Sequence, residues 1–145
     1  MLWWEPIARL LAAAALGALP GLEREARGKP AGLKTFVLVA AGACAFMPIT
    51  LRLPHTAEVD TQGADIVRAI SGVITGIGFL GGGAIIQSRG DVSGITTAAG
   101  IWVTGGIGLA CGAGFYDLGA YLAALMLLTL TVLSRVEDRW LKPKK

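Results

Sequence analysis

Two apolar, glycine-rich stretches in the middle of the chain constrain its fold more than any other feature. The first reads GVITGIGFLGGGAII (Gly72–Ile86) and the second reads TTAAGIWVTGGIGLACGAG (Thr96–Gly114). Each is long enough to cross, or nearly cross, the hydrocarbon core of a bilayer, which takes about 20 helical residues. Glycine at this density would destabilise a helix in water by roughly 1 kcal/mol per residue. In a membrane it allows helix backbones to approach closely. The chain is therefore predicted to be a polytopic membrane protein with tightly packed helices.

The composition of the whole chain supports this prediction. Of its 145 residues, 54% are apolar and 21 are glycine, about twice the glycine share of an average protein, roughly 7%. The mean hydropathy is +0.63. We expect an all-α membrane protein, a five-helix transmembrane bundle in one domain (residues 1–145), with connections too short to hold a soluble domain. The expected spans are Pro6–Leu22, Thr35–Leu51, Ile66–Ile86, Thr97–Ala113 and Leu118–Leu133.

Basic residues are distributed unequally between the two sides of this bundle. If the N-terminus lies outside the cell, ten of the thirteen lysines and arginines fall on the opposite side. Cytoplasmic loops of membrane proteins are rich in these residues. We therefore expect an inner-membrane protein with its N-terminus outside and its C-terminus in the cytoplasm. The ten residues are Arg24, Arg27, Lys29, Lys34, Arg89, Arg135, Arg139, Lys142, Lys144 and Lys145.

Small residues recur at four-residue intervals in three of the predicted helices, so that they share one helix face. Such rows let helix backbones pack closely in membranes. Ala13, Gly17 and Gly21 form one row. The third and fourth helices are expected to pack against each other, or across an oligomer axis, through Gly76, Gly108 and their neighbours. The positions predicted to lie at helix contacts are Gly72, Gly76, Gly100, Thr104, Gly108 and Gly112.

Few ionisable residues lie within the spans. Asp65 and Arg68 open the third span one turn apart, where an ion pair is favoured, and Arg9 lies about one turn inside the first. An uncompensated buried charge costs several kcal/mol. We therefore predict that Asp65 contacts Arg9, Arg68 or both and connects the first helix to the third. This cluster is either a polar functional site on the outer side or an anchor that sets the depth of the helices.

The motif Gly76-x-Gly78-x-x-Gly81 matches the GxGxxG pattern of dinucleotide-binding proteins. That pattern requires a preceding strand and a turn that opens a helix. Here it lies inside an unbroken apolar segment, so nucleotide binding is not expected. The two cysteines, in apolar runs, and the lone His55 give no metal-binding spacing. We expect no catalytic residue, cofactor or metal site, and the spans hold no carboxylate cluster that would indicate an ion pathway.

Two polar segments flank the apolar spans. Glu23 and Arg24 are expected in the first cytoplasmic loop, where the simplest interpretation is a solvated loop. Ser93, Thr96 and Thr97 are expected to precede the fourth helix and to cap its free N–H groups.

Besides Asp65 and Arg68, four motifs form a characteristic combination: GLERE (Gly21–Glu25), AGLKT (Ala31–Thr35), GIGFLGGG (Gly76–Gly83) and GITTAAGIWVTGGIG (Gly94–Gly108). In this combination the chain resembles the MgtC/SapB family of bacterial inner-membrane proteins. The resemblance spans roughly residues 8 to 114, and the order, spacing and number of the spans agree with it. Many family members also carry a soluble C-terminal domain, and this chain resembles a short form without it.

The resemblance implies a non-enzymatic regulator linked to magnesium limitation and magnesium homeostasis. Family members act on partner membrane proteins such as ATP synthase or transporters. The implied partners are membrane lipids and another membrane protein, with a possible homo-oligomer and no nucleic acid. The alternative is a small channel or transporter for an ion or small solute, suggested by the glycine-rich helices and the charged cluster. The positions that the resemblance marks as functional are Glu23, Arg24, Asp65, Arg68, Gly78, Gly81, Thr97 and Trp102.

Overall fold

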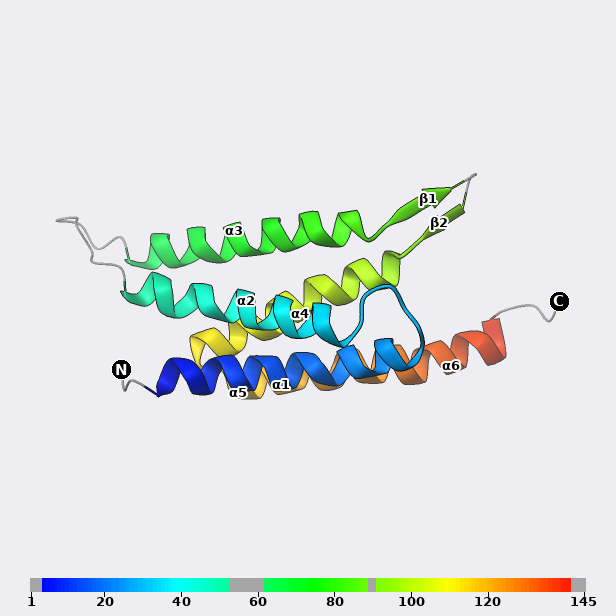
Figure 1. Cartoon of the computed structure of the whole chain (residues 1–145), viewed down its shortest axis with the longest axis horizontal. Helices are drawn as coiled ribbons and strands as arrows, with labels where there is room; N and C mark the ends of the chain where they lie inside the picture. Colours follow the sequence, from blue (N-terminus) through cyan, green and yellow to red (C-terminus); the bar gives the residue numbers. More distant parts are fainter. Residues whose placement is uncertain (1–3, 53–61, 89–90, 142–145) are drawn as a thin grey trace.

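The computed structural model is an all-α bundle whose helices lie side by side along its long axis, with a short β-hairpin at one end (Figure 1). It describes residues 4–52, 62–88 and 91–141. Five helices in these ranges are long and apolar enough to cross a membrane. The predicted five-helix architecture is therefore confirmed.

The described elements follow the chain in a simple order. The last crossing continues past α5 through two π-helical segments, η1 and η2. The bounds are α1 Glu5–Ala26, α2 Leu33–Arg52, α3 Gln62–Gly83, β1 Ile86–Ser88, β2 Asp91–Ser93, α4 Ile95–Ala113, α5 Tyr116–Leu128, η1 Thr129–Leu133, α6 Ser134–Val136 and η2 Glu137–Leu141.

Helix α4 forms the centre of the bundle and packs against α1, α2, α3 and α5. Its small-residue row at 100, 104, 108 and 112 is buried. Gly108 faces Ala40 and Ala43 of α2, and a Cβ atom at Gly112 would lie 2.9 Å from the Cβ of Met47. Glycine at these positions allows the α2 and α4 backbones to approach closely, as small residues do in membranes.

The row on α1 also packs against α2. A Cβ atom at Gly17 would lie 2.8 Å from the Cβ of Ala40, and one at Gly21 would lie 2.9 Å from the Cα of Leu33. Helix α2 is therefore held between the small-residue faces of α1 and α4.

Helix α3 packs against α4, as predicted, but Gly76 and Gly108 themselves do not meet. Its contacts use Ile77, which faces Gly105, and Gly81, whose added Cβ would lie 3.1 Å from the carbonyl oxygen of Ala98. Gly76 is exposed, and a Cβ there would meet nothing within 4 Å. Within one chain the predicted Gly76–Gly108 contact is wrong, because Gly108 lies on the face of α4 that α2 covers. The alternative, an oligomer axis, stays a prediction.

Gly72, like Gly76, makes no packing contact within the chain. It is exposed, and a Cβ there would also meet nothing within 4 Å. The predicted helix contact at Gly72 is therefore absent from the single chain.

The segment between α3 and α4 is a β-hairpin, with Ile86 opposite Ser93. Helix α3 therefore ends at Gly83, three residues before the predicted end of its span. The N-cap of α4 is Gly94, which has a φ of +87° and no side-chain cap. A Cβ at Gly94 would contact the Ala84 carbonyl oxygen, so only glycine suits this turn. The predicted capping of α4 by serine and threonine side chains is wrong.

Candidate functional site

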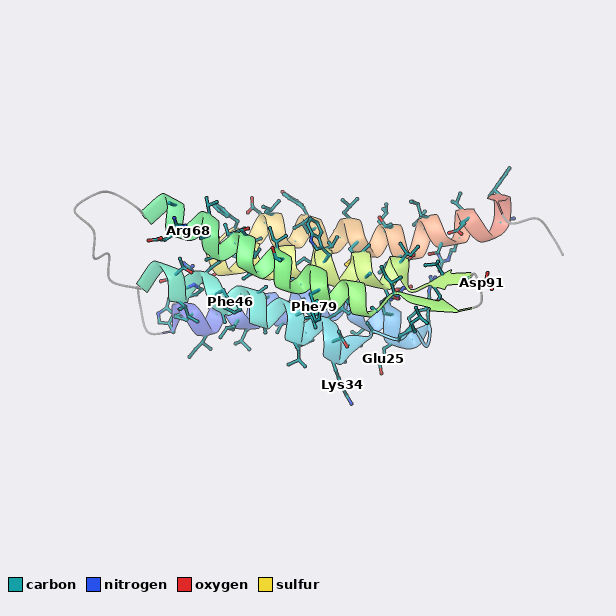
Figure 2. All side chains as sticks on the ribbon, turned by 90° about the horizontal axis from the view of Figure 1, so that it is seen from above. Glu25, Lys34, Phe46, Arg68, Phe79 and Asp91 are labelled. Atoms are coloured by element: carbon teal, nitrogen blue, oxygen red, sulfur yellow. The ribbon has the colours of Figure 1, made fainter. Side chains whose placement is uncertain are left out.

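A pocket of about 560 Å³ opens at the hairpin end of the bundle. Its lining comes from the end of α1 and the following loop, the hairpin, the first turn of α4 and the last transmembrane helix. Figure 2 shows Asp91 of the hairpin and Glu25 of α1 at this end, whereas Arg68 lies at the opposite end. Segments far apart in the sequence thus meet around one cavity.

Arg24 and Thr97 meet at this pocket. Helix α1 extends to Ala26, four residues beyond the predicted span, so Arg24 lies in its last turns and not in a solvated loop. Only 4% of Arg24 is exposed. Its Nη2 donates a hydrogen bond to Oγ1 of Thr97 in the first turn of α4. Its buried Nε has no hydrogen-bond partner in the described part of the chain.

Glu23 also lines the pocket. Its Oε1 lies 2.5 Å from Nε of Arg27, one turn further along α1, as an ion pair. Neither carboxylate oxygen of Glu23 has hydrogen-bond geometry to a described residue. Glu25 points elsewhere and accepts a hydrogen bond of 3.0 Å from the backbone N–H of Leu33, which fixes the loop between α1 and α2. The fold therefore brings together three of the predicted site residues that the sequence separates widely.

A second buried arginine lies at the opposite end of α4. Arg9 is 8% exposed; its Nη1 donates to the carbonyl oxygen of Gly112 at 2.5 Å and its Nη2 to Oε1 of Glu5 at 2.6 Å. A cation is favourable at a helix C-terminus, where carbonyl groups lack partners within the helix. Arg9 thus connects α1 to the end of α4.

The predicted contact between Asp65 and Arg68 is confirmed, with 3.8 Å between Oδ1 and Nη1. Their side chains are 46% and 82% exposed, respectively. An exposed pair of this kind contributes about 0–1 kcal/mol. The predicted connection from Asp65 to Arg9 is wrong, because the Arg9 guanidinium is bonded to Glu5 and Gly112 instead. The geometry is that of a surface pair.

The remaining predicted positions lie apart from the pocket. Gly78 is exposed on α3, and Trp102 is exposed on α4. Gly81 is buried against Ala98. In the described ranges no group of three or more His, Cys, Asp or Glu could hold a metal ion, and His55 lies outside those ranges.

Sequence reasoning missed the contribution of the last helix, which brings Ser134 and Glu137 to the pocket. It also missed the bond from Arg9 to α4. A signal for the second was present, because an arginine inside a span needs an acceptor at the same depth, and the C-terminal carbonyls of the fourth span lie on that side.

The sequence pattern of the MgtC family matches residues 10–139. The chain belongs to the MgtC family. Among its MgtC-family relatives, the putative magnesium transporter YhiD of Escherichia coli K12 is 42% identical over 131 residues, 90% of this chain and 60% of YhiD. The protein SrpB of Synechococcus elongatus is 41% identical over 146 residues, 92% of this chain and 78% of SrpB. The protein MgtC of Salmonella typhimurium is 40% identical over 135 residues, 93% of this chain and 54% of MgtC.

This member of the MgtC family thus spans about 60% of the length of YhiD and about half that of the Salmonella MgtC. No solved structure matches it significantly. Family membership and the five apolar helices together identify a multi-pass membrane protein.

Proposed function

We propose that this protein is a non-enzymatic regulator in the bacterial inner membrane that acts by binding another membrane protein through α3. The observation that carries the proposal is the unequal burial of the helices. Within the bundle, 56% of the α4 span is buried but only 11% of the α3 span. A helix so weakly covered by its own chain has most of its surface free for another helix.

The exposed surface of α3 has the composition of a helix-docking face. Glycines at 72, 76, 78 and 82 are exposed, and a Cβ atom at each would meet nothing within 4 Å. Beside them an apolar groove of about 610 Å³ lies between α2 and α3. Small exposed residues let a second helix backbone approach closely, which is how helices associate in lipid.

The interior of the bundle favours a regulator over a transporter. In the described ranges the buried charged residues are Arg9 and Arg24, each bonded to one end of α4. Between them the core consists of apolar clusters built around side chains such as Phe36 and Ile107. Ion paths through membranes are lined by ionisable or polar groups, and this core offers few.

The second candidate is a small channel or transporter for an ion or small solute, with magnesium as the first ion to test. It is favoured by the 42% identity to a protein named as a putative magnesium transporter. A path between copies of the chain, along the exposed face of α3, would be compatible with the apolar core. Both candidates share the proposed topology, with the hairpin end in the cytoplasm, a single domain over residues 1–145 and a possible homo-oligomer.

A flux assay distinguishes the two candidates. The purified chain is reconstituted in liposomes that contain a magnesium-sensitive dye, and uptake is compared with protein-free liposomes. A regulator gives equal uptake in both. Uptake that depends on the protein and is blocked by Gly76→Leu, but not by Ala124→Leu on the exposed face of α5, would establish the transporter instead.

A further inference from the structure

The N-terminus of α4 opens onto the pocket at the hairpin end without a side-chain cap. Its N-cap is Gly94, which has no side chain to offer, and Gly94 and residues 95 to 97 all line the cavity. The first N–H groups of a helix have no partner within the helix. Together they carry a partial positive charge and form a natural binding site for an anion.

Arg24 is a second, independent feature of the pocket that favours an anion. It is almost completely buried, lines the same pocket and bonds Thr97 at the start of α4. Its guanidinium therefore lies beside the positive end of the α4 dipole, an unfavourable place for a cation. A buried cation is costly unless it is paired, and its Nε has no partner in the described ranges.

The two acidic neighbours of Arg24 in the sequence have their direct bonds elsewhere. Glu23 forms its ion pair with Arg27, and Glu25 accepts a hydrogen bond from the backbone N–H of Leu33. Lys29 adds a further cation to the lining. Arg24, Lys29 and the end of α4 thus present three positive groups to one cavity.

We propose that this pocket binds a phosphate group, held by the Arg24 guanidinium and the N–H groups at the start of α4, with Lys29 beside it. Phosphate has several acceptor oxygens, so it can accept hydrogen bonds from the guanidinium and from backbone N–H groups together. The cavity is larger than a phosphate ion, and Ile95 and Leu130 give it an apolar side. The phosphate therefore belongs to an anionic phospholipid headgroup or to a soluble phosphate compound. A phosphate site in this pocket goes beyond the proposed regulatory function and does not depend on it.

The experiment uses the purified full chain. In detergent, the thermal midpoint is measured with inorganic phosphate or pyrophosphate and with chloride at equal ionic strength. In parallel, native mass spectrometry measures retention of phosphatidylglycerol against phosphatidylcholine. A thermal midpoint that rises more in phosphate or pyrophosphate than in chloride identifies a soluble ligand. Retention of phosphatidylglycerol in preference to phosphatidylcholine identifies a lipid. No response in either arm overturns the proposal.

Variants then locate the site. Arg24→Gln should bind phosphate or phosphatidylglycerol roughly tenfold more weakly or worse, because it loses charge-assisted hydrogen bonds. The matched control is Arg9→Gln, which removes the buried arginine at the other end of α4 and should retain the ligand response. If Arg24→Gln does not fold, Lys29→Gln replaces an exposed residue and should still weaken binding several-fold. Wild-type affinity in the variant that is measured overturns the assignment.

Discussion

A methyl group added at Gly108 is expected to destabilise the bundle, although Gly108→Ala improves intrinsic helix propensity. A Cβ atom there would contact the carbonyl oxygen of Ala40 and would lie 2.8 Å from the Cβ of Ala43. Real Cβ atoms essentially never lie so close, so α2 must move away from α4. Overpacking of this kind costs about 1–3 kcal/mol, against a propensity gain of up to about 1 kcal/mol. With the full propensity gain, the net expectation is a loss of about 0–2 kcal/mol, or about 1–3 kcal/mol relative to the same substitution at an unpacked glycine.

The matched control is Gly76→Ala, the same change on a helix surface where a Cβ meets nothing within 4 Å. It should be neutral or slightly stabilising. Leu125→Ala, on an exposed face of α5, should also be mild, whereas Gly108→Leu should misassemble. The assay is reversible unfolding in mixed detergent micelles. Equal free energies of unfolding for Gly108→Ala and Gly76→Ala would refute the close α2–α4 contact.

Three further outcomes are expected. Arg9→Gln should lower the midpoint of thermal unfolding more than Arg68→Gln, because Arg9 is buried and bonded to α4 while Arg68 is exposed; an equal effect would contradict the link from α1 to α4. Asp65→Asn should change the free energy of unfolding by less than about 1 kcal/mol, as for surface ion pairs, and a larger loss in the same assay would contradict its assignment as a surface pair. Reporter fusions should place Lys145 in the cytoplasm and His55 outside; a cytoplasmic His55 would reverse the topology.

The architecture could be predicted from sequence because apolar spans and glycine spacing are local signals. The four-residue row that includes Gly108 and Gly112 identified a contact face on the fourth helix. It could not identify the partner, because any small-residue helix suits such a face. The structure places α2 there, and α3 instead meets the neighbouring face of α4 near Gly105.

The pocket could not be predicted for a different reason. Glu23 and Arg24 follow the last strongly apolar residue of the first span, so hydropathy alone ends the helix before them. The helix continues for one more turn, which carries Arg24 to Thr97 across 73 residues of sequence. The resemblance to a known family marked both residues, but only the three-dimensional structure brings them to one cavity.

The proposed regulatory role is tested most directly by photo-crosslinking in living cells. A photoreactive residue replaces Phe79 on α3, which is 83% exposed, and a control replaces Tyr121 on α5, which is 70% exposed. Position 79 is expected to crosslink to a different membrane protein, and Gly76→Leu in the same chain is expected to abolish the adduct. Crosslinks to lipid or to a second copy alone, or equal adducts from positions 79 and 121, would contradict a regulator that binds its partner through α3.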